Sequence, residues 1–294
     1  MKRVAVVAHT RKSLGGGLDE LRHLLAHEGL RPAWYEVDKS KQAPKRARRA
    51  AREGAELLIV WGGDGMVQRC LDAVAGLPVE VAIMPAGTAN LLATNLGIPR
   101  DLPAAVDIGL RGERRKLDLG TVNGEHFAVM AGAGFDALMI RDADRKLKDR
   151  VGKAAYVWTG ARHIRADRVR TRVEVDEVPW FDGPASCVLV GNVGTIMGGL
   201  TPFPEASPDD GVLEVGVVTA KGPLQWSRVF GRMTVGRAKK SKLVRMTSGS
   251  SIDVRLERRL PYELDGGARP PAKRLRVAVE PAAVTICVPS EAPA

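Results

Sequence analysis

The stretch that decides the fold is ELLIVWGGDGMVQRCLDAVAG, residues 56–76. An apolar run over residues 57–61 ends at Gly62-Gly63-Asp64-Gly65, and apolar residues then recur at helical spacing up to Val74. This order predicts a buried strand, a glycine turn and an amphipathic helix. Glycines let a backbone approach a phosphate closely, and the unpaired N–H groups of the following helix point at it. Asp64 is placed either to cap that helix or to face a metal held by phosphates.

A second glycine turn follows the next expected strand, residues 79–84. It reads PAGTAN, residues 85–90, and precedes a short apolar helix expected over residues 91–96. Thr88 occupies the expected N-cap position of that helix, and Gly97 the position of a C-terminal glycine. Turns after successive parallel strands lie at one sheet edge, so both are expected to border one ligand site. The alternative is that these glycines serve only the packing of strand-to-helix joints.

Composition predicts a globular protein attracted to polyanions. The 294 residues are 45% hydrophobic, enough for two domains with a buried core. A net charge of +11 favours nucleotide phosphates, acidic lipid headgroups or non-specific nucleic acid, although 4% aromatic residues leave few platforms for base stacking. Three widely separated cysteines argue against a disulfide framework and fit a reducing cytosol. No apolar run approaches the roughly 20 residues of a membrane-spanning helix, so any membrane contact is expected to be peripheral.

The order of expected elements predicts two domains. Strands alternate with helices over residues 1–117, which predicts an α/β domain with a mostly parallel sheet. Residues 118–294 read as short strands and predict a β-rich antiparallel sandwich, with one helical interruption over residues 137–165. The basic segment 39–52 contains no acid. It is interpreted as a solvated helix face, with a landing site for ATP or an anionic membrane as the alternative.

Several motifs together resemble the diacylglycerol kinase catalytic-domain family, which includes bacterial lipid kinases and sphingosine kinases. In chain order they are GGDG at 62–65, PAGTANLLATNLGIP at 85–99, LDLG at 117–120, GAGFDA at 132–137, VGKAAY at 151–156, PEASPDDGVLEV at 204–215 and YELDGG at 262–267. NAD kinases and phosphofructokinases have turns similar to GGDG. The ordered set is more specific than any single motif.

The resemblance implies that ATP binds in a cleft between the domains. The residues implied around its phosphates are Gly62, Gly63, Asp64, Gly65, Met66, Val67, Gln68 and Thr88, with Lys12 as a source of positive charge. Asp64 would orient Mg²⁺ or the attacking hydroxyl. A structural Mg²⁺ site is implied at Ser207, Asp210 and Val212, with Asp118 in the same acid and water network. The alternative for residues 209–211 is a plain hairpin turn.

Four positions depart from the family pattern. Met66 stands where the family has threonine, Val37 replaces another threonine, and residues 9–13 replace the first-turn motif. Gly267 stands where the family carries a glutamate proposed as general base. Since glycine cannot accept a proton, Asp265 is predicted as the local substitute, on the expectation that it lies in an extended strand. Asp64 is the other candidate base, and a turn aspartate is the alternative for Asp265.

The leading hypothesis is therefore an ATP- and Mg²⁺-dependent kinase that phosphorylates a hydroxyl group of a diacylglycerol-like lipid. It is expected to be cytoplasmic and peripherally associated with an anionic membrane surface. One alternative is a nucleotide- or lipid-binding regulator that has lost catalysis, and another is an NAD kinase-like enzyme. Specific nucleic-acid binding is not expected. The sequence leaves the lipid substrate and a homodimer open.

Overall fold

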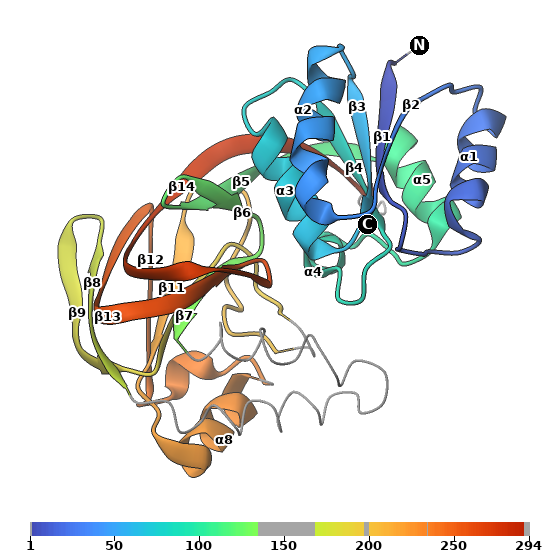
Figure 1. Cartoon of the computed structure of the whole chain (residues 1–294). Coiled ribbons are helices and arrows are strands. Elements are labelled where there is room, and N and C mark those ends of the chain that lie inside the picture. The colour runs from blue at the N-terminus through green and yellow to red at the C-terminus, as the bar shows by residue number, and fades with distance from the viewer. Residues whose placement is uncertain (1, 135–167, 197–199, 234, 291–294) are drawn as a thin grey trace. The chain divides into compact units, whose positions relative to one another are not determined.

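The computed structural model describes residues 2–134, 168–196, 200–233 and 235–290 (Figure 1). The chain divides into two compact units, one made of Met1–Leu119 with Pro281–Ala294 and the other of Gly120–Glu280. The C-terminal residues thus join the N-terminal unit, although the order of expected elements had grouped them with the second domain. The helix expected over residues 137–165, including the VGKAAY motif, lies outside the described residues.

The N-terminal unit is built on a parallel sheet. Its strands are β1 (Val4–His9), β2 (Ala33–Val37), β3 (Leu57–Gly62) and β4 (Glu80–Pro85), in the order β2-β1-β3-β4. The end of β14 (Gly267–Val288) adds a further parallel strand beside β4 through Thr285 and Ile286. Every residue of β1 and β3 is buried, as expected for strands that are covered on both faces.

Helices cover both faces of this sheet. The helices are α1 (Gly17–His27), α2 (Ala43–Arg52), α3 (Asp64–Val74), α4 (Leu91–Asn95) and α5 (Leu102–Arg111). Figure 1 shows α2 and α3 on one side of the strands and α1 and α5 on the other, and each pair packs together. In α2, Ala43, Ala47 and Ala50 are buried at helical spacing, which turns the basic side chains outward. The expected α/β organisation is confirmed.

The C-terminal unit is a β-rich, mainly antiparallel structure, as expected. Its strands include β6 (Glu125–Phe127), β7 (Met130–Gly134), β8 (Val169–Val175), β9 (Val178–Ala185), β10 (Cys187–Gly191), β11 (Leu213–Val218), β12 (Val244–Gly249) and β13 (Ser251–Leu264). Strands β12, β11, β10, β7 and β13 are neighbours in that order, with β8 and β14 also pairing with β13. β5 (Glu113–Val122) and β14 pass from one unit to the other.

Alternating side chains build the core of this unit. In β8 the valines are buried and the arginines are exposed, the pattern of a strand with one solvated face. Val173, Val190, Val215 and Val254 meet in one apolar cluster. Two elements were absent from the sequence expectations, the strand β9 and the helix α8 (Gly222–Met233). Pro179 and Gly183 interrupt the alternation of β9, and two glycines obscure the helical pattern of α8.

Candidate functional site

Three glycine-rich turns begin at one edge of the N-terminal sheet. In the parallel register, Gly62 of β3 lies opposite Pro85 of β4, and Ala8 of β1 lies opposite Trp61 of β3. The turns that follow these strands therefore leave the sheet at neighbouring positions, as expected for a ligand site at the carboxyl ends of parallel strands.

The second and third of these turns are in backbone contact. A Cβ atom added at Gly87 would lie 2.4 Å from the Cα of Gly63 and 2.5 Å from Oδ1 of Asn90. A Cβ at Gly63 would lie 3.0 Å from the Cα of Gly87. Glycine is required at both positions because the two chains cross without room for a side chain. By contrast, a Cβ at Gly65 would meet no other atom within 4 Å, so this backbone borders open space.

Asn90 holds the PAGTAN turn in shape. It is buried and adopts a left-handed conformation with φ 51°. Its amide nitrogen donates to the carbonyls of Pro85 and Gly87 at 2.9 and 3.0 Å, and its Oδ1 accepts the Gly87 N–H at 2.9 Å. Asn90 was not predicted as a site residue from the sequence. An asparagine directly before a helix was the available signal, since its side chain bonds to nearby backbone and tolerates positive φ.

Asp64 joins the two turns. Its carboxylate accepts the N–H of Asn90 at 2.9 Å and that of Leu91, so it caps α4 from 26 residues away in sequence. Burial raises the pKa of Asp64, and the N–H bonds from Leu91 and Asn90 oppose that rise. The prediction of Thr88 as N-cap was wrong, because the N-cap is Asn90. Thr88 is exposed in the preceding turn. Gly97 has φ 71° directly after the helix, as predicted.

The residues after GGDG face the protein interior. The side chains of Met66, Val67 and Gln68 are buried, so these residues can reach a ligand only through their backbone. The N–H groups of Met66 and Val67 already donate to the Gly63 carbonyl, at 2.8 and 3.1 Å. Gly65 is exposed in the first turn of α3. The structure therefore leaves the Gly65 backbone as the part of this turn best placed to meet a phosphate.

Lys12 lies in the turn after β1, which is tied to the neighbouring strand. The indole Nε1 of Trp61 donates to the Lys12 carbonyl at 3.1 Å, and the Lys12 side chain is exposed. The Arg11 N–H donates to Nδ1 of His9 at 3.2 Å. Burial lowers the pKa of His9, and the charges of Lys12 and Arg11 lower it further. By accepting the Arg11 N–H, the His9 ring helps to shape this turn.

Asp265 sits in a tight turn, so the expectation of an extended strand was wrong. Asp265 and Gly266 have φ 46° and 77°, and they connect the paired residues Leu264 and Gly267 of β13 and β14. This is a two-residue hairpin of the Asp-Gly type. The Asp265 carboxylate accepts the N–H groups of residues 128, 129 and 130 at 2.8, 2.8 and 2.9 Å. These bonds clamp the segment before β7 to the hairpin, and they compete with any substrate hydroxyl for the carboxylate.

The space beside Gly267 is filled by the end of the Arg269 side chain, which would have to shift to admit a larger residue. A Cβ at Gly267 would lie 2.7 Å from a guanidinium nitrogen of Arg269. That guanidinium donates to the Gly267 carbonyl at 2.8 Å and pairs with Glu125, whose hydrogen bond raises the pKa of Arg269. Glu263, which the sequence analysis did not consider, is fully buried, and its Oε2 accepts the Gly266 N–H at 2.6 Å. The Arg269–Glu125 ion pair and the hydrogen bond from the Gly266 N–H to Glu263 both stabilise the hairpin.

The candidate metal residues occupy two separate pieces of chain. In the C-terminal unit, Oδ1 of Asp210 accepts the Val212 N–H at 3.1 Å, and the Ser207 hydroxyl donates to Asp209 at 2.6 Å. In the N-terminal unit, buried Asp118 accepts the Ala282 N–H at 2.7 Å. No cluster of three His, Cys, Asp or Glu side chains suited to a metal occurs in the described residues. The 207–212 loop nevertheless offers a carboxylate and carbonyls, the hard oxygen donors that Mg²⁺ prefers.

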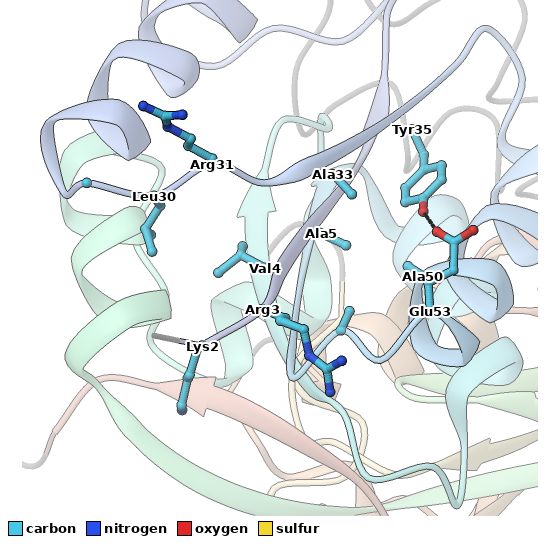
Figure 2. A pocket seen from close by; sticks show the side chains of 12 residues that line it. Lys2, Arg3, Val4, Ala5, Leu30, Arg31, Ala33, Tyr35, Ala50 and Glu53 are labelled. Atoms are coloured by element: carbon cyan, nitrogen blue, oxygen red, sulfur yellow. Dashed lines mark hydrogen bonds between the residues drawn. The ribbon is translucent and has the colours of Figure 1, made fainter.

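A separate pocket opens at the opposite end of the parallel strands (Figure 2). Its volume is about 590 Å³, and Val4 and Ala33, the first residues of β1 and β2, line it. The Tyr35 hydroxyl donates to Glu53 at its wall. Because the glycine turns lie at the carboxyl ends of these strands, this pocket is not part of the candidate phosphate site. Among the described helices, none combines the length and apolar character of a membrane span.

Comparisons with known proteins cover nearly the whole chain. Residues 8–122 match the family described as the diacylglycerol kinase catalytic domain, and residues 129–288 match the YegS C-terminal NAD kinase beta sandwich-like domain. A diacylglycerol kinase of Staphylococcus carnosus is 27% identical over 265 residues, covering 88% of this chain and 86% of that protein. A Pseudomonas aeruginosa protein named "Probable lipid kinase YegS-like" is 29% identical over 301 residues, covering 99% of this chain and 96% of that protein.

Solved structures share the fold. A crystal structure of a diacylglycerol kinase from Bacillus anthracis superposes with a TM-score of 0.81 at 22% identity, covering 98% of this chain and 97% of that one. An NAD kinase from Archaeoglobus fulgidus in complex with ATP gives a TM-score of 0.55 at 12% identity, covering 97% and 93%. At such identities the likeness concerns the fold alone.

Proposed function

The chain belongs to the diacylglycerol kinase catalytic-domain family, and we propose that it is a lipid kinase that transfers the γ-phosphate of ATP to a hydroxyl group of a diacylglycerol-like lipid. The observation that carries the proposal is the backbone contact between Gly63 and Gly87, locked by the bonds of Asp64 to Asn90 and Leu91. This contact holds the two glycine turns together at the carboxyl ends of β3 and β4.

The proposed nucleotide site follows from this arrangement. The Gly65 backbone borders open space at the start of α3, where unpaired N–H groups and the helix dipole favour a phosphate. Exposed Thr88 and Lys12 supply a hydroxyl donor and a positive charge from the two flanking turns. The buried side chains of residues 66–68 hold α3 in place. Methionine in place of threonine at position 66 is therefore expected to weaken phosphate binding little, because the side chain at this position is turned inward.

We propose that Ser207, Asp210 and Val212, all in the 207–212 loop of the C-terminal unit, hold a Mg²⁺ ion. The exposed Asp210 carboxylate and the loop carbonyls have the donor chemistry that the ion requires. Bound Mg²⁺ supplies neutralisation of phosphate charge, on which phosphoryl transfer depends.

Asp64 is the better candidate for proton acceptor. Burial raises the pKa of Asp64, which brings a carboxyl group closer to the range useful in general-base catalysis. Both carboxylates accept backbone N–H groups, but Asp265 accepts three from residues 128–130 and also sits in a hairpin turn. We therefore propose Asp64 as the acceptor and Asp265 as the residue that positions residues 128–130.

The test is a kinase assay with the purified chain. We expect ATP- and Mg²⁺-dependent phosphorylation of diacylglycerol in mixed micelles, with sphingosine and NAD as parallel substrates, and a loss of at least about 100-fold in Asp64→Asn. Phosphorylation of NAD without any lipid product would instead make the chain an NAD kinase-like enzyme. A rate unaffected by Asp64→Asn would remove Asp64 from the chemistry.

A second candidate function is a nucleotide- or lipid-binding regulator without turnover. Gly267 carries no carboxylate, and the guanidinium of Arg269 lies within 2.7 Å of the position that its Cβ would take. Calorimetry that detects ATP binding, together with an absence of product from every lipid on a broad panel, would favour this function.

A further inference from the structure

The C-terminal unit carries a strongly basic surface segment, residues 221–233 and 235–245, that includes α8 and the chain up to the start of β12 (Figure 1). The segment contains eight Lys or Arg and no Asp or Glu. Nothing in the proposed phosphate or Mg²⁺ sites uses it.

Helix α8 has one buried and one exposed face. Trp226, Val229 and Met233 are buried at helical spacing and attach the helix to the unit. Leu224 and Arg228 are exposed on the other face, and Val235 is exposed just beyond the helix. Leu224 and Val235 are 66% and 63% exposed, among only four large exposed hydrophobic side chains in the described residues. These two side chains stand at opposite ends of α8, and each has Lys or Arg neighbours within three to four residues in the sequence.

The positive charge of the segment is mostly uncompensated within the described part of the chain. Lys239 pairs with Glu205, and Arg232 donates to the Lys240 carbonyl. Arg228, Arg237 and Lys242 are exposed, and no acid of the described residues forms a salt bridge with them. Cations around exposed apolar side chains form the pattern of a surface that enters the headgroup region of a bilayer.

We propose that the basic surface segment docks the protein on an anionic lipid bilayer, with Leu224 and Val235 entering the interface and the surrounding cations contacting lipid phosphates. The proposal rests on the proposed function, because a kinase of membrane lipids must meet its substrate at a bilayer surface. Each cation near an anionic surface strengthens adsorption, and buried apolar side chains add a contribution that salt does not screen.

The second basic segment, residues 39–52, provides a matched control. Its cations Lys45 and Arg48 are exposed on α2, but no large hydrophobic side chain of this segment is exposed. Arg49 is paired with Glu53. Charge alone therefore does not distinguish the two segments, whereas the exposed apolar pair does.

The test is sedimentation of the full chain, without ATP, with vesicles of phosphatidylcholine alone or mixed with phosphatidylglycerol. Arg228→Gln with Arg237→Gln is expected to weaken binding to the anionic vesicles about 30-fold. Leu224→Ser with Val235→Ser is expected to weaken it at least about 10-fold and to leave its salt dependence unchanged. Lys45→Gln with Arg48→Gln is expected to have less than a threefold effect. Melting curves verify that each variant is folded.

Several outcomes would overturn the proposal. One is binding to anionic vesicles that is unchanged in both variants of the basic surface segment. Another is a loss of vesicle binding in the α2 variant as large as in those two variants. A third is no binding to any lipid vesicle, which would point to an acidic protein partner. If the protein binds duplex DNA as strongly as anionic vesicles, and the Leu224 and Val235 changes do not weaken this DNA binding, the segment is a general polyanion-binding surface. Since the assay needs no phosphoryl transfer, it separates failure of docking from failure of the kinase proposal.

Discussion

The contact between Gly63 and Gly87 predicts the effect of a single methyl group. In Gly87→Ala the new Cβ would lie 2.4 Å from the Gly63 Cα and 2.5 Å from Oδ1 of Asn90, both shorter than real Cβ contacts allow. One neighbour is backbone and the other is a buried side chain with three hydrogen bonds, so neither can yield cheaply.

The magnitude follows from two contributions. Overpacking of a rigid site costs about 1–3 kcal/mol, and loss of the Gly87 N–H bond to Asn90 adds about 1 kcal/mol. We therefore expect the free energy of unfolding of the N-terminal unit to fall by about 2–4 kcal/mol, with weaker ATP binding because the two turns separate. Urea denaturation followed by the fluorescence of buried Trp61 measures the first effect, and calorimetry with ATP measures the second.

Gly65→Ala is the matched control. Its Cβ would meet nothing within 4 Å, and alanine favours the helix by up to about 1 kcal/mol, so stability should hold or rise. If a phosphate approaches this backbone as proposed, ATP affinity should nevertheless fall. A Gly87→Ala protein with normal stability and normal ATP affinity would refute the reasoning, as would a Gly65→Ala protein that unfolds as easily as Gly87→Ala.

Three further predictions concern carboxylates. Asp64→Asn leaves one oxygen to accept a backbone N–H but turns an NH₂ donor toward the other, so it should cost about 1–3 kcal/mol of stability in denaturant titrations. An unchanged midpoint would contradict the capping role. Asp265→Asn should destabilise the C-terminal unit by a similar amount, about 1–3 kcal/mol, and loosen residues 128–130. Faster amide hydrogen exchange at these residues would detect the loosening, and unchanged exchange rates would disprove it. Burial tends to raise the pKa of Asp253, but hydrogen bonds from Arg274 and Arg255 outweigh it and lower that pKa below its ordinary 3.8. The folded protein thus gains stability from Asp253 above about pH 3.8 and loses it as the pH falls through the lowered pKa. In Asp253→Asn the melting temperature should therefore fall less steeply with decreasing pH in the acid range. Equal slopes for the variant and the unchanged protein would rule this out.

Local patterns in the chain anticipated much of the fold. The strand, glycine turn and helix over residues 57–74 follow from a buried apolar run, three glycines and helical spacing, which are all local properties. Gly97 was recognisable for the same reason, since a helix end in the left-handed region favours glycine. Helix α8 was missed because the surrounding strands and its own glycines hide a single amphipathic stretch.

The sequence by itself determined that glycine turns follow parallel strands and that a β-rich part comes after them, because strand and helix periodicity and turn chemistry act between near neighbours. Only the tertiary structure decided what the carboxylates do. Asp64 caps a helix 27 residues away, and Asp265 binds backbone N–H groups up to 137 residues away. Such partners are chosen by how the strands pair, and no local pattern encodes that pairing.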